Sequence, residues 1–227
     1  MSVEKARSAH YEKPKLRENK MYWFLVSMLG FFVMIFLHFR SVEHTKLQEK
    51  YGKEGGIRLG KIYAMISSLE FVFWVGLWVS PQQIFVIPMF SDFVVSIANL
   101  STAIPNLIIS LPLILVGAWF GIKGVRETGL KLAETHCSPK KILKTGVYST
   151  LRHPQYFGWI LAHVGISVFL SVYYSILFSP VLIAVIYLLS RKEEEELIKE
   201  FGNEYKDYQR EVPMLLPRRK IFELKKS

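Results

Sequence analysis

The sequence has a single cysteine, one long stretch without basic residues and one without any charge. Cys137 stands alone among 227 residues, which argues against a disulfide framework. No lysine or arginine lies between Lys61 and Lys123, and no charged residue lies between Pro154 and Ser190. The mean hydropathy is +0.23 despite 21% charged residues, because charged and apolar residues occupy separate parts of the chain. This separation is typical of a polytopic membrane protein and argues against a disordered tail or an ordinary soluble enzyme.

Sequence patterns of several catalytic and cofactor sites are also absent. No Gly-x-Gly-x-x-Gly run occurs, and the glycines of residues 52–56 lie in the wrong context to hold a phosphate. The six histidines show no metal-ligand spacing, so no metal site is predicted. The 29 basic residues outnumber the 19 acidic ones, but they are divided among membrane-tethered loops. This distribution favours anionic lipid headgroups as partners and argues against nucleic acid.

The apolar runs predict an all-α fold with about five transmembrane helices. A hydrocarbon core of about 30 Å needs about 20 apolar residues at a helical rise of about 1.5 Å. Three runs have about this length, at residues 21–39, 62–79 and 103–122. Residues 156–190 are 35 uncharged residues, roughly 52 Å as one helix, which exceeds the bilayer. We therefore predict a C-terminal helical hairpin with its tip at residues 173–175, where two tyrosines suit the interface.

Several residues interrupt or modify these runs. Pro105 and Pro112 are expected to kink the third run. Residues 82–100 contain a proline and an aspartate and are interpreted as an interfacial or partly re-entrant piece. Glu70 lies inside a predicted span, where an acid is costly, so we expect it to face a polar environment. His163 is interpreted either as a buried hydrogen-bonding residue or as part of an access path.

The charges between the spans predict which side of the membrane each loop faces. Residues 40–61 hold six basic and three acidic residues, and residues 123–152 hold seven and two. The positive-inside rule places both segments in the cytoplasm, and the hairpin returns residues 191–227 to the same side. An odd number of spans places the N-terminus outside, although its first 20 residues also carry six basic residues. Its sidedness therefore stays open.

The most patterned segment lies where the predicted hairpin begins, at residues 145–158. Pro154 suits the first turn of a helix, where its missing N–H has no helical partner. The next N–H groups should point out of the helix start, where the helix dipole favours an anion; they belong to Gln155, Tyr156 and Phe157. Neighbouring side chains add hydrogen-bond donors and flat faces for a heterocycle: Arg152, His153, Tyr148 and Tyr156. The alternative is a basic interfacial collar with tyrosine anchors.

A second helix with a charged start is predicted at the other end of the hairpin. Residues 191–196 are Arg-Lys-Glu-Glu-Glu-Glu, and apolar residues follow at helical spacing: Leu197, Phe201, Tyr205, Tyr208 and Val212. Only one or two of the glutamates can face back toward the hairpin, and a carboxylate there would suit an ammonium group. The alternative is a solvated charge run, since acids are favourable near helix starts.

These two segments form a double pattern. The first half is Gly-x-Tyr-x-x-x-Arg-His-Pro-x-Tyr-x-Gly, from Gly146 to Gly158. The second half is Glu-Glu-x-x-Leu-x-x-x-Phe-Gly-x-x-Tyr-x-x-Tyr, from Glu193 to Tyr208. The pattern resembles that of the isoprenylcysteine carboxyl methyltransferases and of their relatives, the phospholipid N-methyltransferases. The resemblance covers roughly residues 115–217, whereas the first 110 residues show only helical spans.

The resemblance implies S-adenosylmethionine as the cofactor, held at the cytoplasmic mouth of the bundle without a Rossmann domain. It places cofactor contacts on Lys140, Lys141, Ile142, Leu143, Gly146, Tyr148, His153, Pro154, Gln155, Tyr156, Glu193 and Glu194. It further implies catalytic roles for Glu193 and Arg152. These positions agree with the residue chemistry: helix-start amides for a carboxylate, a tyrosine face for adenine, and a glutamate for an amine.

One position departs from the family pattern. The family usually has an arginine four residues before the first glutamate of the pair, a position held here by Leu189. Arg191 lies two residues further on, about 200° around the helix. A register that pairs Arg191 with Glu195 breaks the spacing to Phe201. The preferred register therefore leaves a substrate carboxylate without its usual partner.

The sequence thus predicts an integral-membrane methyltransferase whose lipophilic acceptor arrives from the bilayer. Isoprenylcysteine-type carboxyl O-methylation is the leading chemistry, with N-methylation of a phospholipid or other lipid amine as the alternative. A membrane sterol reductase that uses NADPH shares the Arg-His-Pro-x-Tyr segment but has a different tail, and a non-catalytic adaptor is a third interpretation. The predicted organisation is an N-terminal part of transmembrane helices, residues 1–114, and a catalytic region with a cytoplasmic tail helix, residues 115–227.

Overall fold

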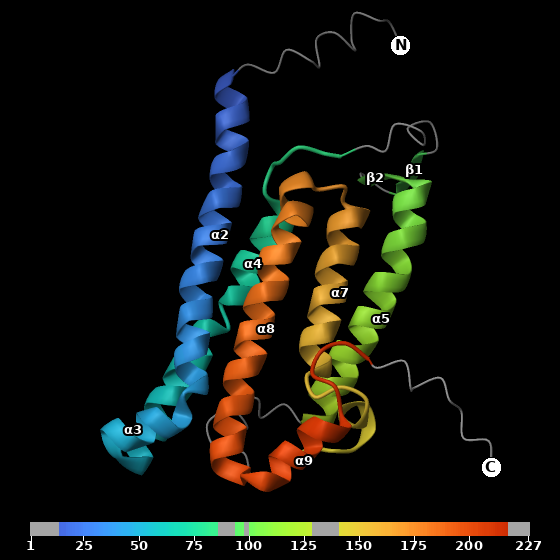
Figure 1. Cartoon of the computed structure of the whole chain (residues 1–227). Helices are drawn as coiled ribbons and strands as arrows, with labels where there is room; N and C mark the ends of the chain where they lie inside the picture. The colour runs from blue at the N-terminus through green and yellow to red at the C-terminus, as the bar shows by residue number, and fades with distance from the viewer. Residues whose placement is uncertain (1–13, 86–93, 98–99, 129–140, 218–227) are drawn as a thin grey trace, which may run out of the picture.

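The computed structural model of the chain describes residues 14–85, 94–97, 100–128 and 141–217, which form a bundle of long helices (Figure 1). A small antiparallel hairpin of β1 (Val94–Ile97) and β2 (Leu100–Ala103) precedes the third long helix. The elements, in chain order, are α2 (Pro14–Val42), α3 (His44–Ser67), α4 (Glu70–Val79), β1 (Val94–Ile97), β2 (Leu100–Ala103), α5 (Ile104–Thr128), the 3₁₀ helix η2 (Gly146–Ser149), α7 (Pro154–Phe169), α8 (Tyr173–Phe201) and α9 (Asn203–Glu211).

Four stretches of the described helices are long and apolar enough to cross a membrane. They are α2 from Met21, α3 with α4, α5, and α8. Helix α7 has 16 residues, about 24 Å, and lies in the same bundle between α5 and α8 (Figure 1). The helical membrane fold is thereby confirmed, while the count of five spans stays a prediction. The predicted run at residues 62–79 is divided, because α3 ends at Ser67 and α4 begins at Glu70.

The turn between α7 and α8 lies three residues earlier than the sequence predicted. It occupies residues 170–172, and the tyrosines at 173 and 174 already belong to α8. Ser171 adopts a left-handed backbone with φ of 57°, which ends α7. The Phe85 N–H donates to the Ser171 carbonyl, and the Tyr173 N–H donates to the Gln83 carbonyl. The chain before β1 therefore fixes the turn by backbone pairing that no local pattern reveals.

Aromatic side chains of α2, α4 and α8 form much of the core. Phe31 lies edge-on to Trp74 at 6.1 Å between ring centroids and to Phe178 at 5.9 Å. The Trp74 indole N–H donates to Nδ1 of His163 at 2.8 Å, and the ring of His163 is fully buried. Of the two interpretations of His163, the structure supports the buried hydrogen-bonding residue.

Helices α5 and α7 approach each other through glycines. A Cβ added to Gly158 would lie 2.5 Å from the carbonyl oxygen of Gly117 and 2.7 Å from the backbone nitrogen of Gly121. Small residues allow this closeness, which gives the van der Waals contact that holds helices together in lipid. Because α7 begins at Pro154, this contact fixes the position of the patterned segment relative to α5.

We expect the substitution Gly158→Ala to destabilise the protein by about 1–3 kcal/mol, because the added methyl group forces the two helices apart. Thermal unfolding of the detergent-purified protein measures the effect. Gly121→Ala is the matched control, since a Cβ at that position meets nothing within 4 Å. The control should leave the unfolding midpoint unchanged or raise it slightly. Equal midpoints for Gly158→Ala and the unsubstituted protein would contradict the close packing.

The polar connections gather at one end of the bundle. In Figure 1 the turn between α2 and α3, the end of α5, η2 and α9 all lie at this end, opposite the start of α2. The two segments rich in basic residues, 40–61 and the described part of 123–152, lie at this end. This agrees with the prediction that both segments lie on the same side. Which face of the membrane it occupies stays a prediction.

Candidate functional site

A pocket lies at the polar end of the bundle. Its volume is about 200 Å³, whereas a cavity for one water molecule needs only about 10–15 Å³. The pocket can therefore hold a ligand of many atoms. Helices α2, α7, α8 and α9, the end of α5 and the segment around η2 supply its walls. The lining residues are His38, Val42, His44, Thr128, Lys141, Ile142, Leu143, Tyr148, Arg152, His153, Gln155, Tyr156, Trp159, Glu193, Glu196, Leu197, Tyr205 and Tyr208.

An ion pair between Arg152 and Glu194 organises the wall between α8 and α9. Arg152 Nε donates to one carboxylate oxygen of Glu194 at 2.6 Å, and a terminal nitrogen donates to the other at 3.1 Å. The remaining terminal nitrogen donates to the backbone carbonyls of Gln209 and Val212. Both side chains are less than 10% exposed. Arg152 thus holds α9 and the chain after it against the start of α7.

Backbone hydrogen bonds reinforce this junction. The N–H groups of Arg152 and His153 donate to the carbonyls of Pro213 and Met214, at 2.9 and 3.1 Å. The chain after α9 therefore pairs with the residues just before α7. The Gln209 amide also donates to Glu194 at 2.7 Å. The carboxylate of Glu194 therefore contacts three side chains, those of Arg152, His153 and Gln209.

His153 joins the two neighbouring carboxylates of α8. Its Nε2 lies 3.2 Å from Glu194, and its Nδ1 lies 3.4 Å from Glu193. Its ring stacks on that of Tyr156, with 5.6 Å between centroids and 7° between planes. Burial alone would lower the pKa of His153, but the hydrogen bonds and charges of the two glutamates raise it above its usual value. The two glutamates of α8 therefore favour the imidazolium form of His153.

Glu193 and Tyr148 present contrasting chemistry to the pocket. The Tyr156 hydroxyl donates to the Glu193 carboxylate, which fixes the position of this acid. The Tyr148 hydroxyl accepts a hydrogen bond from the Gln155 amide at 3.0 Å. Burial raises the pKa of Tyr148 to about 12, so its ring stays neutral at physiological pH. The pocket thus combines an anchored carboxylate with an uncharged aromatic face.

The helix start offers fewer N–H groups than the sequence predicted. The Phe157 N–H donates to the His153 carbonyl at 3.1 Å, so the prediction that it points out of the helix is wrong. The reason is local: His153 is the N-cap, and its carbonyl accepts the first helical bond. Within the described chain, Gln155 and Tyr156 make no such backbone bond. Two amides therefore remain for an anion.

Gly146 does not line the pocket and faces an acid instead. Its φ is +60°, and a Cβ there would lie 2.2 Å from a carboxylate oxygen of Glu127. The Val147 N–H donates to the same carboxylate at 3.0 Å. The absence of a side chain at Gly146 therefore lets Glu127, near the end of α5, approach η2. Pro154 and Glu194 also lie outside the lining set, the first at the start of α7 and the second in the ion pair with Arg152.

Most other predicted site residues meet at the pocket. They are Lys141, Ile142, Leu143, Tyr148, Arg152, His153, Gln155, Tyr156 and Glu193, whereas Lys140 lies outside the described residues. Sequence reasoning missed the contributions of α2 and the α2–α3 corner, His38, Val42 and His44. One sequence feature pointed to this contribution. Glu70 is an acid within a predicted span, and its carboxylate pairs with His38.

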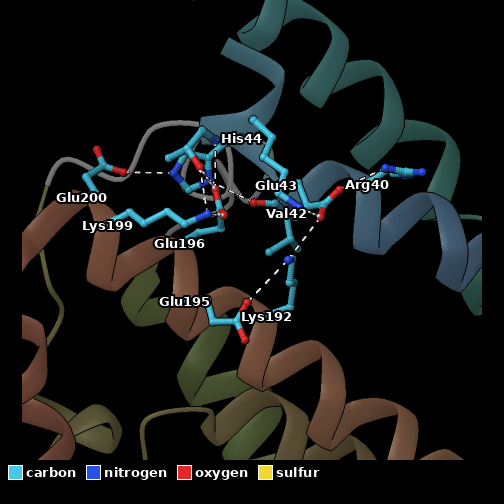
Figure 2. A network of polar contacts seen from close by, with 11 residues as sticks. Arg40, Val42, Glu43, His44, Lys192, Glu195, Glu196, Lys199 and Glu200 are labelled. Atoms are coloured by element: carbon cyan, nitrogen blue, oxygen red, sulfur yellow. Dashed lines mark hydrogen bonds and ion pairs between the residues drawn. The ribbon is translucent and has the colours of Figure 1, made fainter. Parts of the chain in front are cut away.

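A network of polar contacts fastens α8 to the α2–α3 corner, as Figure 2 shows. The buried carboxylate of Glu196 accepts hydrogen bonds from the N–H and hydroxyl of Thr45. His44 Nε2 lies 3.1 Å from a carboxylate oxygen of Glu200. Partial burial would raise the pKa of Glu43, but hydrogen bonds from Lys46 and Lys192 lower it to about 2. The corner thereby closes the pocket on the side of the N-terminal helices.

Position 189, where the family pattern has an arginine, is apolar and buried. Leu189 is 2% exposed and belongs to the main hydrophobic core. Arg191 is exposed and donates to the Tyr187 hydroxyl at 3.4 Å. No guanidinium from this part of α8 therefore replaces the arginine at position 189.

Fold and site together define a helical membrane protein with a polar pocket at one end of its bundle. The family model described as phospholipid methyltransferase matches residues 105–204, from α5 into α9. The predicted resemblance to the integral-membrane methyltransferases is thereby confirmed, over the part of the chain that supplies most of the pocket.

Relatives with methyltransferase names include the following three proteins. Methanethiol S-methyltransferase of Crocosphaera subtropica is 31% identical over 98 residues, 43% of this chain and 38% of the relative. Methanethiol S-methyltransferase 2 of Bradyrhizobium diazoefficiens is 33% identical over 99 residues, 44% and 38% of the two chains. Protein-S-isoprenylcysteine O-methyltransferase of Mus musculus is 39% identical over 85 residues, 34% and 27%. The matched part of the chain thus spans less than two-fifths of each relative.

Proposed function

We propose that the protein is an integral-membrane methyltransferase that uses S-adenosylmethionine and methylates a lipophilic acceptor. The observation that carries this proposal is the pocket itself. It brings the anchored carboxylate of Glu193, the neutral ring of Tyr148 and the start of α7 into one cavity. These are the partners that an ammonium, an adenine and a carboxylate require, and this set fits the amino-acid and adenine parts of the cofactor.

Each group of the pocket has a distinct task in this proposal. Glu193, held by the Tyr156 hydroxyl, binds the ammonium group of the cofactor. The amides of Gln155 and Tyr156 bind its carboxylate, and Tyr148 stacks on its heterocycle. Arg152 is a positioning residue, because its guanidinium is occupied by Glu194 and by two backbone carbonyls. The bound cofactor supplies an electrophilic methyl group on a sulfonium.

The pocket also reaches the apolar interior of the bundle. Val42 and Trp159 line it together with the polar groups. In the proposed function the acceptor enters along this apolar side from the bilayer, and the cofactor enters from the cytoplasm. Desolvation in the pocket then favours methyl transfer, because the acceptor's nucleophilic atom loses its competing water.

Carboxyl O-methylation of an isoprenylcysteine is one candidate reaction, supported by the name of the Mus musculus relative. Methylation of a lipid amine or of a thiol is the second, supported by the family description and by the methanethiol relatives. The apolar Leu189 favours the second candidate, because an acceptor carboxylate finds no guanidinium at this position.

Calorimetry on the detergent-purified protein tests the proposed function. We expect S-adenosylhomocysteine to bind with micromolar affinity and NADPH not to bind. Tyr148→Ala should weaken S-adenosylhomocysteine at least about fivefold, since stacking of a base on an aromatic ring contributes about 1–3 kcal/mol. Tyr173→Ala is the matched control, because Tyr173 begins α8 at the opposite end of the bundle. Binding of NADPH alone would favour a reductase, and binding of neither compound would favour an adaptor.

A further inference from the structure

We propose that the Tyr205 hydroxyl donates a hydrogen bond to a purine ring nitrogen of the methyl donor, and hence that α9 recognises the edge of its adenine base. This inference rests on the proposed methyltransferase function and names a further residue that determines the specificity of the same site. Tyr205 lies just beyond the matched residues 105–204. The sequence patterns predicted no cofactor contact for it.

The hydroxyl of Tyr205 is a free hydrogen-bond donor in the pocket. Tyr205 is 3% exposed and lines the pocket. Its hydroxyl has no hydrogen-bond partner among the residues that the structure describes. It is also not sealed inside the protein, since Asn106 Oδ1 is the described side-chain atom that is both fully buried and without a partner. Because almost all of Tyr205 is covered, the space that its hydroxyl reaches is the pocket.

The neighbouring tyrosine of α9 has a different task. The ring of Tyr208 lies edge-on to that of Tyr205, with 5.8 Å between centroids and 69° between planes. The Tyr208 hydroxyl donates to the backbone carbonyl of Tyr148 and so joins α9 to η2. Since the ring of Tyr148 is the proposed face for the heterocycle, this bond holds α9 beside the base. Tyr208 is thus used for the fold, whereas the hydroxyl of Tyr205 remains available to a ligand.

Apolar side chains surround Tyr205 on this side of the pocket. Ile142, before η2, and Leu197, on α8, line the pocket and pack against the cluster of Tyr205, Tyr208 and Val212. Aliphatic side chains give good contact to the faces of a purine but no hydrogen bond to its edge. A polar atom that is buried without a partner weakens binding. The Tyr205 hydroxyl supplies the donor that these walls lack.

The protonation state of Tyr205 fixes the direction of the hydrogen bond. Burial raises the pKa of Tyr205 above its usual value, and the negative charge of Glu194 raises it further. The charge of Arg152 acts in the opposite direction, but Arg152 is paired with Glu194. The hydroxyl therefore keeps its proton at physiological pH. A purine ring nitrogen with a free lone pair is an acceptor, so the hydroxyl donates and the base accepts.

Calorimetry with the variant Tyr205→Phe tests the contact, because this change removes one oxygen atom and keeps the ring. We expect the affinity for S-adenosylhomocysteine to fall about 2- to 12-fold, the range of one neutral hydrogen bond. The unfolding midpoint should stay unchanged, since the hydroxyl has no partner among the described residues. Tyr187→Phe is the matched control, because Tyr187 on α8 is 44% exposed and does not line the pocket. The control should bind with unchanged affinity.

Three analogues of S-adenosylhomocysteine identify the acceptor on the base. They are the 1-deaza, 3-deaza and 7-deaza compounds, each of which replaces one ring nitrogen by a C–H group. We expect one of them to bind the unsubstituted protein about 2- to 12-fold more weakly than S-adenosylhomocysteine. In Tyr205→Phe this difference should disappear, because the donor is already absent. A purely structural role of Tyr205 would instead weaken all four compounds by the same factor.

Three results would overturn the inference. They are an unchanged affinity in Tyr205→Phe, an equal loss for S-adenosylhomocysteine and all three analogues, and a loss that couples to the 2′-deoxy compound, which would place the contact on the sugar. Absence of S-adenosylhomocysteine binding by the unsubstituted protein would refute the proposed function. If the unsubstituted protein binds S-adenosylhomocysteine and Tyr205→Phe binds it equally well, only the role of Tyr205 fails.

Discussion

Glu193→Gln should weaken the binding of S-adenosylhomocysteine by about 10- to 150-fold, the equivalent of a charged hydrogen bond of about 1.5–3 kcal/mol. Glu193 is the carboxylate that the Tyr156 hydroxyl and His153 hold at the pocket wall. The amide keeps the size of the side chain but removes the negative charge that attracts an ammonium group. Calorimetry measures the affinity, and methyl transfer should fall at least as far.

Glu195→Gln is the matched control for this change. Glu195 lies two residues further along α8, its side chain is 54% exposed, and it does not line the pocket. The control should bind S-adenosylhomocysteine with the affinity of the unsubstituted protein. Equal affinities for Glu193→Gln and Glu195→Gln would contradict the role of Glu193 in cofactor binding.

Arg152→Met should lower the free energy of unfolding by about 3–5 kcal/mol, because it leaves the buried carboxylate of Glu194 without its main partner. The substitution also removes the hydrogen bonds to the carbonyls of Gln209 and Val212, which hold the chain around α9. Thermal and denaturant unfolding in detergent measure the loss. Proteolysis should additionally cut the chain after α9 faster than in the unsubstituted protein.

Two further variants separate this role from a general effect of charge. Arg210→Met removes an exposed pair with Asp207, and such pairs contribute little, so stability should not change measurably. The double variant Arg152→Met, Glu194→Met should be more stable than Arg152→Met alone, since no buried charge is left unpaired. Full stability of Arg152→Met would contradict the proposed anchoring of α9.

Local sequence patterns predicted much of the candidate site. Several residues of the two motifs line one pocket, among them Tyr148, His153 and Glu193, because each motif lies within a helix or next to its start. The Phe157 N–H was wrongly predicted to lack a helical partner, because the position of the N-cap decides which N–H group makes the first helical hydrogen bond. Gly146 was assigned to the cofactor from a resemblance, whereas its neighbour in the fold is Glu127.

The sequence by itself determined the membrane class, the helical runs and the two motifs, because hydrophobicity, helical period and capping act over a few neighbouring residues. Only the tertiary structure decided that His38 meets Glu70, 32 residues away, and that Glu196 meets Thr45, 151 residues away. Such contacts depend on how the helices cross and how closely they pack, which the glycines of α5 and α7 allow and no local pattern specifies.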